Sequence, residues 1–376
     1  MNNYFKFEIL HQSTKSKARV GKIHTKHGII DTPTFVPVAT NASLKAIPLE
    51  NQSNIDLMFC NTYHLMVHPG TNTIKNLGGL HKFMNRSSPI ITDSGGFQVF
   101  SLAYGSVYEE LKSCGKKKNK TCVLKLNEEG VLFRSYRDGS ELLLSPESSI
   151  QAQKNLGADI IIPFDELPPY HFSLNELKKS CERTHRWEER SLKEHLKNPN
   201  DQAIFAVVHG GINHELRKNS CSFLSNLPFD GFAIGGSVGK TKQELFEIVS
   251  FTKKYIPNSF PTHLLGIGDP ESIEKLVSCG IDSFDSSYPT KAARHGSIFY
   301  TQKKQIKIKQ NSYKENPSPI DKRCSCSTCK QYSLAYLHHL FKSHEFSYLS
   351  LLSIHNIQYM TNLMKEIREK ILRNEI

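Results

Sequence analysis

Short apolar runs recur along most of the chain, and each ends at polar residues or glycines. The runs that we interpret as strands are 34–38, 57–63, 90–92, 158–164, 203–208, 231–234, 263–268 and 281–284. Helical stretches lie between them: Ser145-Pro146 is typical of a helix start, and a long basic helix is expected over about 173–197. Strands that alternate with helices predict parallel pairing through crossover helices.

The number of strands and the position of the polar residues favour one architecture. We count eight strands, and polar residues gather at the C-terminal ends of most of them, where a closed barrel places its functional groups. An open doubly wound sheet would normally present one glycine-rich phosphate loop, and residues 235–240 lack the spacing of a P-loop. The sequence therefore predicts an α/β fold, a (β/α)8 TIM barrel.

The two ends of the chain differ from this repeating pattern. Residues 5–28 are polar and basic, and we expect them to form a hairpin that closes the bottom of the barrel. The last helix buries one face, because apolar residues recur at helical spacing from Met360 onward, at Leu363, Met364, Ile367 and Ile371. We predict a TIM-barrel catalytic domain over 1–310, with a lysine-rich insertion near 112–125, and a zinc-binding helical subdomain over 311–376.

Three cysteines stand close together in the second part, at Cys324, Cys326 and Cys329. Three thiols within six residues need a fourth ligand to complete a tetrahedral zinc site. On spacing alone, the histidines within reach are His338, His339, His344 and His355. A set of three cysteines and one histidine fills the coordination shell and leaves no position for water, so a structural zinc ion is favoured over a catalytic one.

The charge of the chain bears on what the barrel binds. Lysine and arginine exceed aspartate and glutamate by 12 in 376 residues, and the isoelectric point is about 9.1. A surplus of this size favours a polyanionic partner, above all nucleic acid. The sequence has no run of 18 apolar residues, and six of its nine cysteines are scattered, so we predict a soluble cytoplasmic protein with no membrane contact.

Carboxylates stand where several predicted strands end. Asp93 follows strand 90–92 and precedes the pair Gly95-Gly96, Asp165 follows Phe164, and Asp285 follows Phe284. A single aspartate after a strand is typical of a helix cap. Because the pattern repeats, we predict instead that several carboxylates meet in one cleft at the C-terminal face of the barrel.

Five motifs that occur in one order carry a resemblance to a known family. They are Asp93-Ser94-Gly95-Gly96-Phe97-Gln98, Phe164-Asp165-Glu166, Gly235-Gly236, Phe284-Asp285 with Pro289-Thr290, and the cysteines at 324, 326 and 329. With these motifs the chain resembles the bacterial tRNA-guanine transglycosylases, from about residue 5 to its end. The resemblance implies a zinc-containing TIM barrel, usually a homodimer, that exchanges the wobble guanine of tRNAs for Asn, Asp, His and Tyr. The incoming base is a 7-deazaguanine in the synthesis of queuosine.

The resemblance also implies catalytic roles for two residues. Asp285 attacks the anomeric carbon of the ribose and forms a covalent intermediate, while Asp93 acts as general acid and base. Two carboxylates in one pocket raise the pKa of one of them, so that one holds a proton while the other is charged. The arrangement parallels a retaining glycosidase. Asp282 is a strand residue, and we expect no catalytic role for it.

Recognition of a guanine-like base needs an acceptor for its N1 and amino hydrogens and a donor for its carbonyl oxygen. The resemblance implies that Asp165 supplies the acceptor, that the backbone N–H of Gly236 supplies the donor, and that Phe97 stacks on the ring. The other residues that it implies are Gly235 and His209 beside the base, Lys291 and Arg294 on the anticodon loop, and His355 as the fourth zinc ligand.

The chain departs from the family pattern around the base pocket. Four side chains differ from those usual in bacterial relatives: His209 replaces Gln, Leu167 replaces Cys, Leu265 replaces Met, and Lys291 replaces Arg. The loop at 235–240 is one residue shorter and has Lys240 in place of an acid. An acid there would favour the cationic aminomethyl group of the bacterial substrate. We therefore predict queuine as the incoming base, with 7-aminomethyl-7-deazaguanine as the alternative.

Two other functions fit part of the sequence. A non-catalytic tRNA-binding subunit would be expected to lack one catalytic carboxylate, whereas Asp93 and Asp285 are both present. A TIM-barrel hydrolase of small sugars accounts for the carboxylates, but it leaves the positive charge and the cysteine cluster unexplained.

Overall fold

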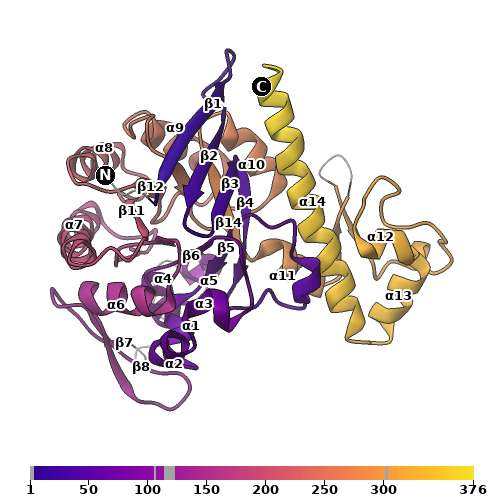
Figure 1. The fold of residues 1–376 in the computed structure, drawn as a ribbon, viewed down its shortest axis with the longest axis horizontal. Helices are drawn as coiled ribbons and strands as arrows, with labels where there is room; N and C mark the ends of the chain where they lie inside the picture. Colours follow the sequence, from indigo (N-terminus) through magenta and orange to yellow (C-terminus); the bar gives the residue numbers. More distant parts are fainter. Residues whose placement is uncertain (1–3, 106, 114–122, 301–303) are drawn as a thin grey trace.

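The computed structural model describes residues 4–105, 107–113, 123–300 and 304–376. Within them, eight parallel strands form a closed barrel, which confirms the predicted TIM-barrel fold (Figure 1). In chain order the barrel strands are β4 (Thr34–Ala39), β5 (Met58–Cys60), β6 (Ile90–Thr92), β10 (Ile160–Ile161), β11 (Ala203–Val208), β12 (Gly231–Ile234), β13 (Thr262–Leu264) and β14 (Ser283–Ser286). β14 pairs with β4 and closes the ring.

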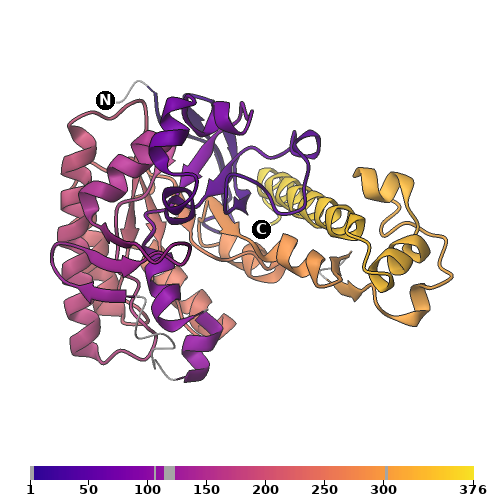
Figure 2. The same ribbon diagram turned by 90° about the horizontal axis from the view of Figure 1, so that it is seen from below.

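Helices lie between the strands and cover the outside of the barrel (Figure 2). They are α1 (Thr62–Val67), α2 (Thr71–Asn76), α3 (Gly79–Phe83), α4 (Gly96–Tyr104), α5 (Val107–Ser113), α6 (Pro146–Leu156), α7 (Leu174–Leu196), α8 (His214–Ser225), α9 (Lys242–Lys253), α10 (Pro270–Val277) and α11 (Tyr288–Arg294). The predicted starts of α6 and α7 are confirmed, because Ser145 and Ser173 cap them through their side chains.

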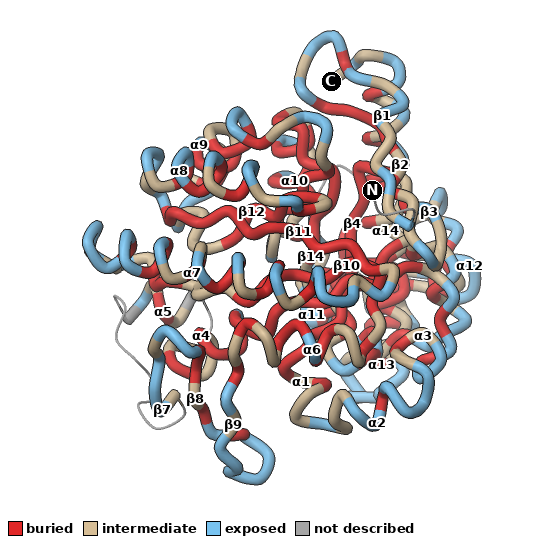
Figure 3. Tube along the Cα trace, turned by 60° about the vertical axis from the view of Figure 1, so that its left-hand side comes forward, coloured by how far each residue is buried: buried red, intermediate tan, exposed pale blue. Residues whose placement is uncertain are grey.

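Strand β11 shows why the sequences of the barrel strands are unbroken apolar runs. All six of its residues are buried, and Figure 3 shows the buried strands enclosed by helices with exposed outer faces. Phe205 and Val207 pack with interior residues of the other strands, while Ile204, Ala206 and Val208 pack in the cluster that includes the helices. A strand that is buried on both faces has no polar positions to alternate with.

The N-terminal segment packs against the bottom of the barrel, but the predicted hairpin over 5–28 is part of a larger sheet that continues to Thr32. It forms an antiparallel sheet of β1 (Lys6–Gln12), β2 (Arg19–Thr25) and β3 (Gly28–Thr32). Ile23 and Ile30 of this sheet join the interior cluster of the barrel, and the ring of Phe5 meets that of Phe205 edge-on at 5.7 Å.

Three predicted strands are shorter in the structure than in the prediction. The segment 57–63 becomes a helix from Thr62, and 263–268 is a strand only to Leu264. The segment 158–164 forms strand pairs only at Ile160 and Ile161. Beyond them, side chains of two helices accept the backbone hydrogen bonds: Gln153 accepts from the N–H of Ile162 at 3.0 Å, and Ser191 accepts from that of Phe164 at 3.1 Å. Conversely, β14 extends through Asp285, which was expected to follow the strand.

The last helix is longer than predicted and joins two parts of the molecule. α14 (Ser347–Leu372) packs against β2, β4 and α11 on one side and against α12 (Ser327–Gln331) and α13 (Leu334–Lys342) on the other (Figures 1 and 2). The division of the chain near residue 310 therefore stays a prediction, since α14 contacts the barrel along one face. Two smaller antiparallel sheets complete the strands of the described residues: β7 (Val123–Leu126), β8 (Val131–Arg134) and β9 (Glu141–Leu144), and β15 (Ser297–Phe299) with β16 (Gln305–Lys307). The same residues include 3-10 turns at Leu49–Asn51 and Asn311–Tyr313.

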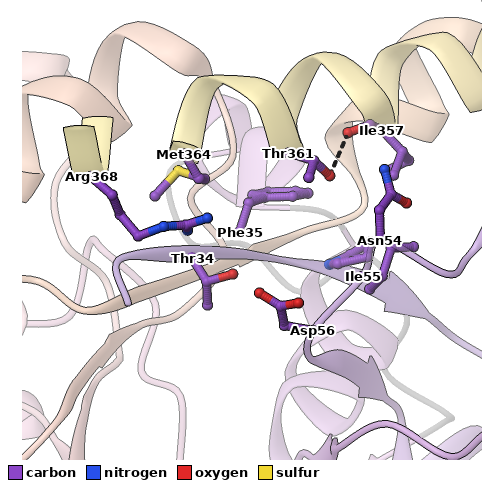
Figure 4. Close-up of a pocket in the computed structure, with 10 residues that line it drawn as sticks. Thr34, Phe35, Asn54, Ile55, Asp56, Ile357, Thr361, Met364 and Arg368 are labelled. Atoms are coloured by element: carbon purple, nitrogen blue, oxygen red, sulfur yellow. Dashed lines mark hydrogen bonds between the residues drawn. The ribbon is translucent and has the colours of Figure 1, made fainter. Parts of the chain in front are cut away.

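A small cavity lies where α14 crosses β4 (Figure 4). Its volume is about 20 Å³, roughly the space of one water molecule. Its polar lining includes Asn54, Asp56 and Arg368, and Arg368 donates to the carbonyl oxygen of Pro33 at 2.8 Å. The cavity is too small for a purine base, and none of the predicted site residues lines it. It belongs to the joint between α14 and the barrel.

Helices that would fit a membrane are absent from the part of the chain that the structure describes, since none combines the required length with the required hydrophobicity.

Candidate active site and metal site

Asp93 lies directly after β6, and its side chain is held from two segments. Its Oδ1 accepts the N–H of Thr62 at 2.7 Å, and its Oδ2 accepts the amide N–H groups of Asn61 at 2.6 Å and of Gln98 at 3.1 Å. Asn61 and Thr62 come from the junction of β5 and α1, and Gln98 comes from α4. Asn61 and Gln98 were not predicted to have a role, although Asn61 also directly follows a barrel strand.

Burial raises the pKa of Asp93 to about 6, even though its three hydrogen-bond donors act to lower it. The negative charge of Asp165 adds a smaller rise. The predicted direction is confirmed, but the main cause is burial rather than a second carboxylate. A carboxyl group with this pKa can give up and take back a proton near neutral pH.

Asp165 lies in the segment that follows β10, and two side chains hold its carboxylate. Its Oδ1 accepts the hydroxyl of Ser94 at 2.7 Å, and its Oδ2 accepts the Nε2–H of His209 at 3.0 Å. The loop of Asp93 approaches closely enough for this contact only because residue 96 is glycine: a Cβ there would lie 2.4 Å from the carbonyl oxygen of Asp165. The structure thus brings the predicted residues Asp93, Asp165 and His209 together.

Asp285 has one carboxylate oxygen held and the other unoccupied. Its Oδ1 accepts the Nε2–H of His263 at 3.1 Å and the N–H of Gly266 at 2.9 Å. Among the described residues, no hydrogen bond uses its Oδ2. The hydroxyl of Ser283 lies 2.7 Å from the other ring nitrogen of His263 and orients the imidazole. His263 was not predicted to have a role, and its only signal in the sequence is a polar residue at the start of a predicted apolar strand.

Gly235 and Gly236 follow β12 and border the same end of the barrel. A Cβ on Gly235 would lie 2.5 Å from Val207, and one on Gly236 would lie 2.9 Å from Nδ1 of His209. The φ of Gly236 is +72°, which disfavours other residues. His209, predicted to border the base, contacts Asp165 with one ring nitrogen and lies against Gly236 with the other, which is buried and unpartnered.

The residues predicted to contact the RNA and the base ring differ in their exposure. Phe97, the second residue of α4, is 47% exposed. Lys291 on α11 is exposed, and Arg294 is half-buried with its Nη1 buried and without a hydrogen bond. Of the lysine-rich insertion near 112–125, residues 114–122 lie outside the described part of the chain.

Three cysteines and one histidine form a compact cluster beside α14. The ligand atoms of Cys324, Cys326, Cys329 and His355 all lie within 4.8 Å of one another, so this set could hold a metal ion. Nδ1 of His355 faces the sulfurs, at 3.2 Å from that of Cys329, and its Nε2 donates to the carbonyl oxygen of Phe299 at 2.8 Å. This second contact fixes the ring as metal-binding histidines usually are fixed. His338 instead bonds the carbonyl oxygen of Ile308 at 2.7 Å.

Two buried aspartates lie at the C-terminal face of the closed barrel, Asp93 directly after β6 and Asp285 near the end of β14. A pair of carboxyl groups on this face can serve as nucleophile and general acid at a glycosidic bond. The family model described as queuine tRNA-ribosyltransferase matches residues 13–376. A queuine tRNA-ribosyltransferase of Protochlamydia amoebophila is 60% identical over 98% of this chain and 95% of its own length. Those of Chlamydia caviae and Chlamydia trachomatis serovar D are 60% and 57% identical over 99% of both chains.

The chain therefore belongs to the queuine tRNA-ribosyltransferase family, and its resemblance to the tRNA-guanine transglycosylases is confirmed. It is an enzyme of the glycosyltransferase class.

Proposed function

We propose that this enzyme replaces the wobble guanine of tRNAs for Asn, Asp, His and Tyr by a 7-deazaguanine base, through a covalent bond between Asp285 and the ribose. One observation above all supports the proposal. Oδ1 of Asp285 is held by His263 and Gly266, whereas Oδ2 has no described partner. A carboxylate fixed at one oxygen presents the other as a nucleophile in a defined direction.

In the first half of the exchange, Oδ2 of Asp285 bonds to C1′ of the ribose as the C1′–N9 bond breaks. The electron pair of that bond leaves with guanine, and protonated Asp93 gives the base its proton. In the second half, the incoming base loses a proton to the Asp93 carboxylate and attacks C1′. Asp285 then departs as a carboxylate, and the donors His263 and Gly266 stabilise its returning charge.

Recognition of the base uses the residues between the two aspartates. Asp165 accepts the N1 and amino hydrogens, and the N–H of Gly236 donates to the carbonyl oxygen. Phe97 has an exposed ring on which the base can stack. Lys291 and Arg294 bind phosphates of the anticodon loop, which is single-stranded and therefore allows the nucleotide to turn out at little cost.

A covalent intermediate can be detected directly. Wild-type enzyme incubated with substrate tRNA and no free base should give a protein–RNA band on a denaturing gel, and added guanine should chase it. Asp285→Ala should give no band and no exchange of labelled guanine, while tRNA affinity changes little. Asp269→Asn is the matched control, because Asp269 also lies beyond the C-terminal end of a barrel strand, but it caps α10 and pairs with Lys242 at 3.3 Å. Undiminished exchange by Asp285→Ala would refute the proposal.

We propose queuine as the incoming base. Lys240 occupies the position of the usual acid, its side chain is exposed, and its Nζ lies 5.4 Å from the ring centre of Tyr170. A cation at this loop disfavours the aminomethyl cation, and the shorter loop leaves room for the cyclopentenediol. Competition of the two bases against labelled guanine should favour queuine, and Lys240→Glu should shift the preference toward 7-aminomethyl-7-deazaguanine. A wild-type preference for the aminomethyl compound would refute this choice.

We propose that Cys324, Cys326, Cys329 and His355 hold one structural zinc ion per chain. Their donor set and spacing fit a closed tetrahedral site, and zinc supplies a cross-link between the α12 segment and α14. Metal analysis of the purified protein should find one zinc per chain in wild type and much less in Cys329→Ser. We also propose the homodimer that the family resemblance implies, which sedimentation equilibrium would test.

A further inference from the structure

Arg217 on α8 is a fully buried cation, 0% exposed, and its bonding partners are unusual. Its Nη1 donates to the carbonyl oxygen of Val208 at 2.7 Å, its Nε to that of Gly211 at 2.9 Å, and its Nη2 to that of Ser237 at 3.0 Å. Across the described ranges of the chain, no carboxylate pairs with it. Burial lowers the pKa of Arg217 to about 10, so it stays charged at neutral pH.

A buried guanidinium without a carboxylate is costly, and an apolar side chain of similar size would avoid that cost. The geometry shows what the guanidinium does that an apolar side chain cannot do. Its planar fork reaches the end of β11, the β11–α8 loop and the β12–α9 loop at the same time. Arg217 therefore joins the two loops that carry His209 and Gly236.

Arg217 contacts groups that bind the residues on either side of Gly236, but it does not bond the N–H of Gly236. Gly235, on one side, donates to the carbonyl oxygen of Val208 at 3.2 Å, and that oxygen also accepts from Arg217. Ser237, on the other side, is held by Nη2. No hydrogen bond within the described chain uses the N–H of Gly236 itself. Both neighbours of Gly236 are thus held through carbonyl oxygens that Arg217 also contacts, that of Val208 for Gly235 and that of Ser237 itself.

We propose that Arg217 is the positioning residue that holds the N–H of Gly236 toward the carbonyl oxygen of the purine base. This inference rests on the proposed function, in which that N–H reads the base. Arg217 is fully buried and therefore does not reach the base itself. Its Nη2 lies 3.8 Å from the point where a Cβ added to Gly236 would stand. It acts through the two loops.

Comparing the binding of two bases can show whether Arg217 positions the N–H of Gly236 or only stabilises the fold. Guanine and 6-thioguanine differ at one atom, because a weakly accepting sulfur replaces the carbonyl oxygen. In wild type, guanine should bind more tightly than 6-thioguanine. In Arg217→Gln the ratio of the two affinities should fall by about tenfold, the factor that corresponds to one hydrogen bond. The matched control is Lys218→Gln, which removes a charge from the exposed side of the same helix and should leave the ratio unchanged.

Arg217→Lys provides a second variant that keeps the charge, in case Arg217→Gln does not fold. One ammonium group cannot bridge three carbonyl oxygens, one at the end of β11 and one in each of two loops, so this variant should also lose discrimination between the two bases. The proposal is overturned if either folded variant weakens both bases by the same factor, or if Arg217→Lys restores the wild-type ratio. Absence of guanine exchange in the wild-type enzyme would instead count against the proposed function, so the two failures are distinguishable.

Discussion

Both ends of the barrel contain buried aspartates, but the groups that bind their carboxylates differ between the two ends. At the bottom, Asp282 receives two hydrogen bonds from Arg19, at 2.8 and 2.6 Å, and Asp159 lies 2.8 Å from His27 and 3.2 Å from His81. At the top, Asp93, Asp165 and Asp285 are held by amide, hydroxyl and imidazole groups. No lysine or arginine pairs with these three within the described residues.

The pKa values of one carboxyl group from each end follow this difference. Burial alone would raise the pKa of Asp159, but the imidazole of His81, the N–H of Ile90 and the charges of both histidines lower it to about 2. Burial raises the pKa of Asp93 to about 6, and no cation opposes it. The same residue type therefore has a lowered pKa at the bottom of the barrel and a raised pKa at the top, the face on which TIM barrels carry their active sites.

The largest expected effect comes from removing the ionisable group at the top. Asp93→Asn should slow guanine exchange by about 10³-fold, within the range for loss of a general acid and base. The folded wild-type protein binds more protons at Asp93 than the unfolded chain between about pH 4 and 6, so its stability falls as pH rises through this window. Asp93→Asn should therefore be as stable as wild type at pH 7 or more stable, by up to about 3 kcal/mol in urea denaturation.

At the bottom of the barrel, replacing an aspartate should reduce stability and leave activity unchanged. Asp282→Asn leaves Arg19 buried without its carboxylate, so the free energy of unfolding should fall by about 3–5 kcal/mol. Exchange per folded molecule should be retained, because Asp282 lies at the far end of the barrel from Asp93. Asp285→Asn, three residues later, should lose exchange and keep its stability. A stable Asp282→Asn that is inactive would contradict the comparison.

The smallest of the three expected effects is the loss of stability on replacing Asp159, and it depends on pH. The lowered pKa of Asp159 adds stability that is fully present above about pH 4 and is lost as pH falls toward 2. Asp159→Asn should therefore be about 2 kcal/mol less stable than wild type at pH 6, and the difference should disappear near pH 2. Chemical denaturation of both proteins across this range measures it. A difference that persists unchanged at pH 2 would show that the histidine contacts of Asp159 add no electrostatic stability.

The sequence by itself determined the kind of fold and the types of residue at the chemical site. Eight apolar runs separated by helices predict a closed barrel, because a barrel covered by helices buries both faces of each strand. The position of Asp93 directly after such a run predicts that it lies at the C-terminal end of the barrel. The cluster at Cys324, Cys326 and Cys329 was visible because its spacing is local. Even the candidates for a fourth ligand could be named, although spacing alone did not choose among them.

Only the tertiary structure decided how each carboxylate is held. Asn61 and His263 are remote in sequence from Asp93 and Asp285, and barrel closure brings them within hydrogen-bond distance. The contacts of Arg217 also depend on two loops that meet only in the folded chain. Whether a buried aspartate becomes part of an ion pair or a reactive acid depends on which groups surround it in space, and hydrophobic periodicity along the chain contains no information about that.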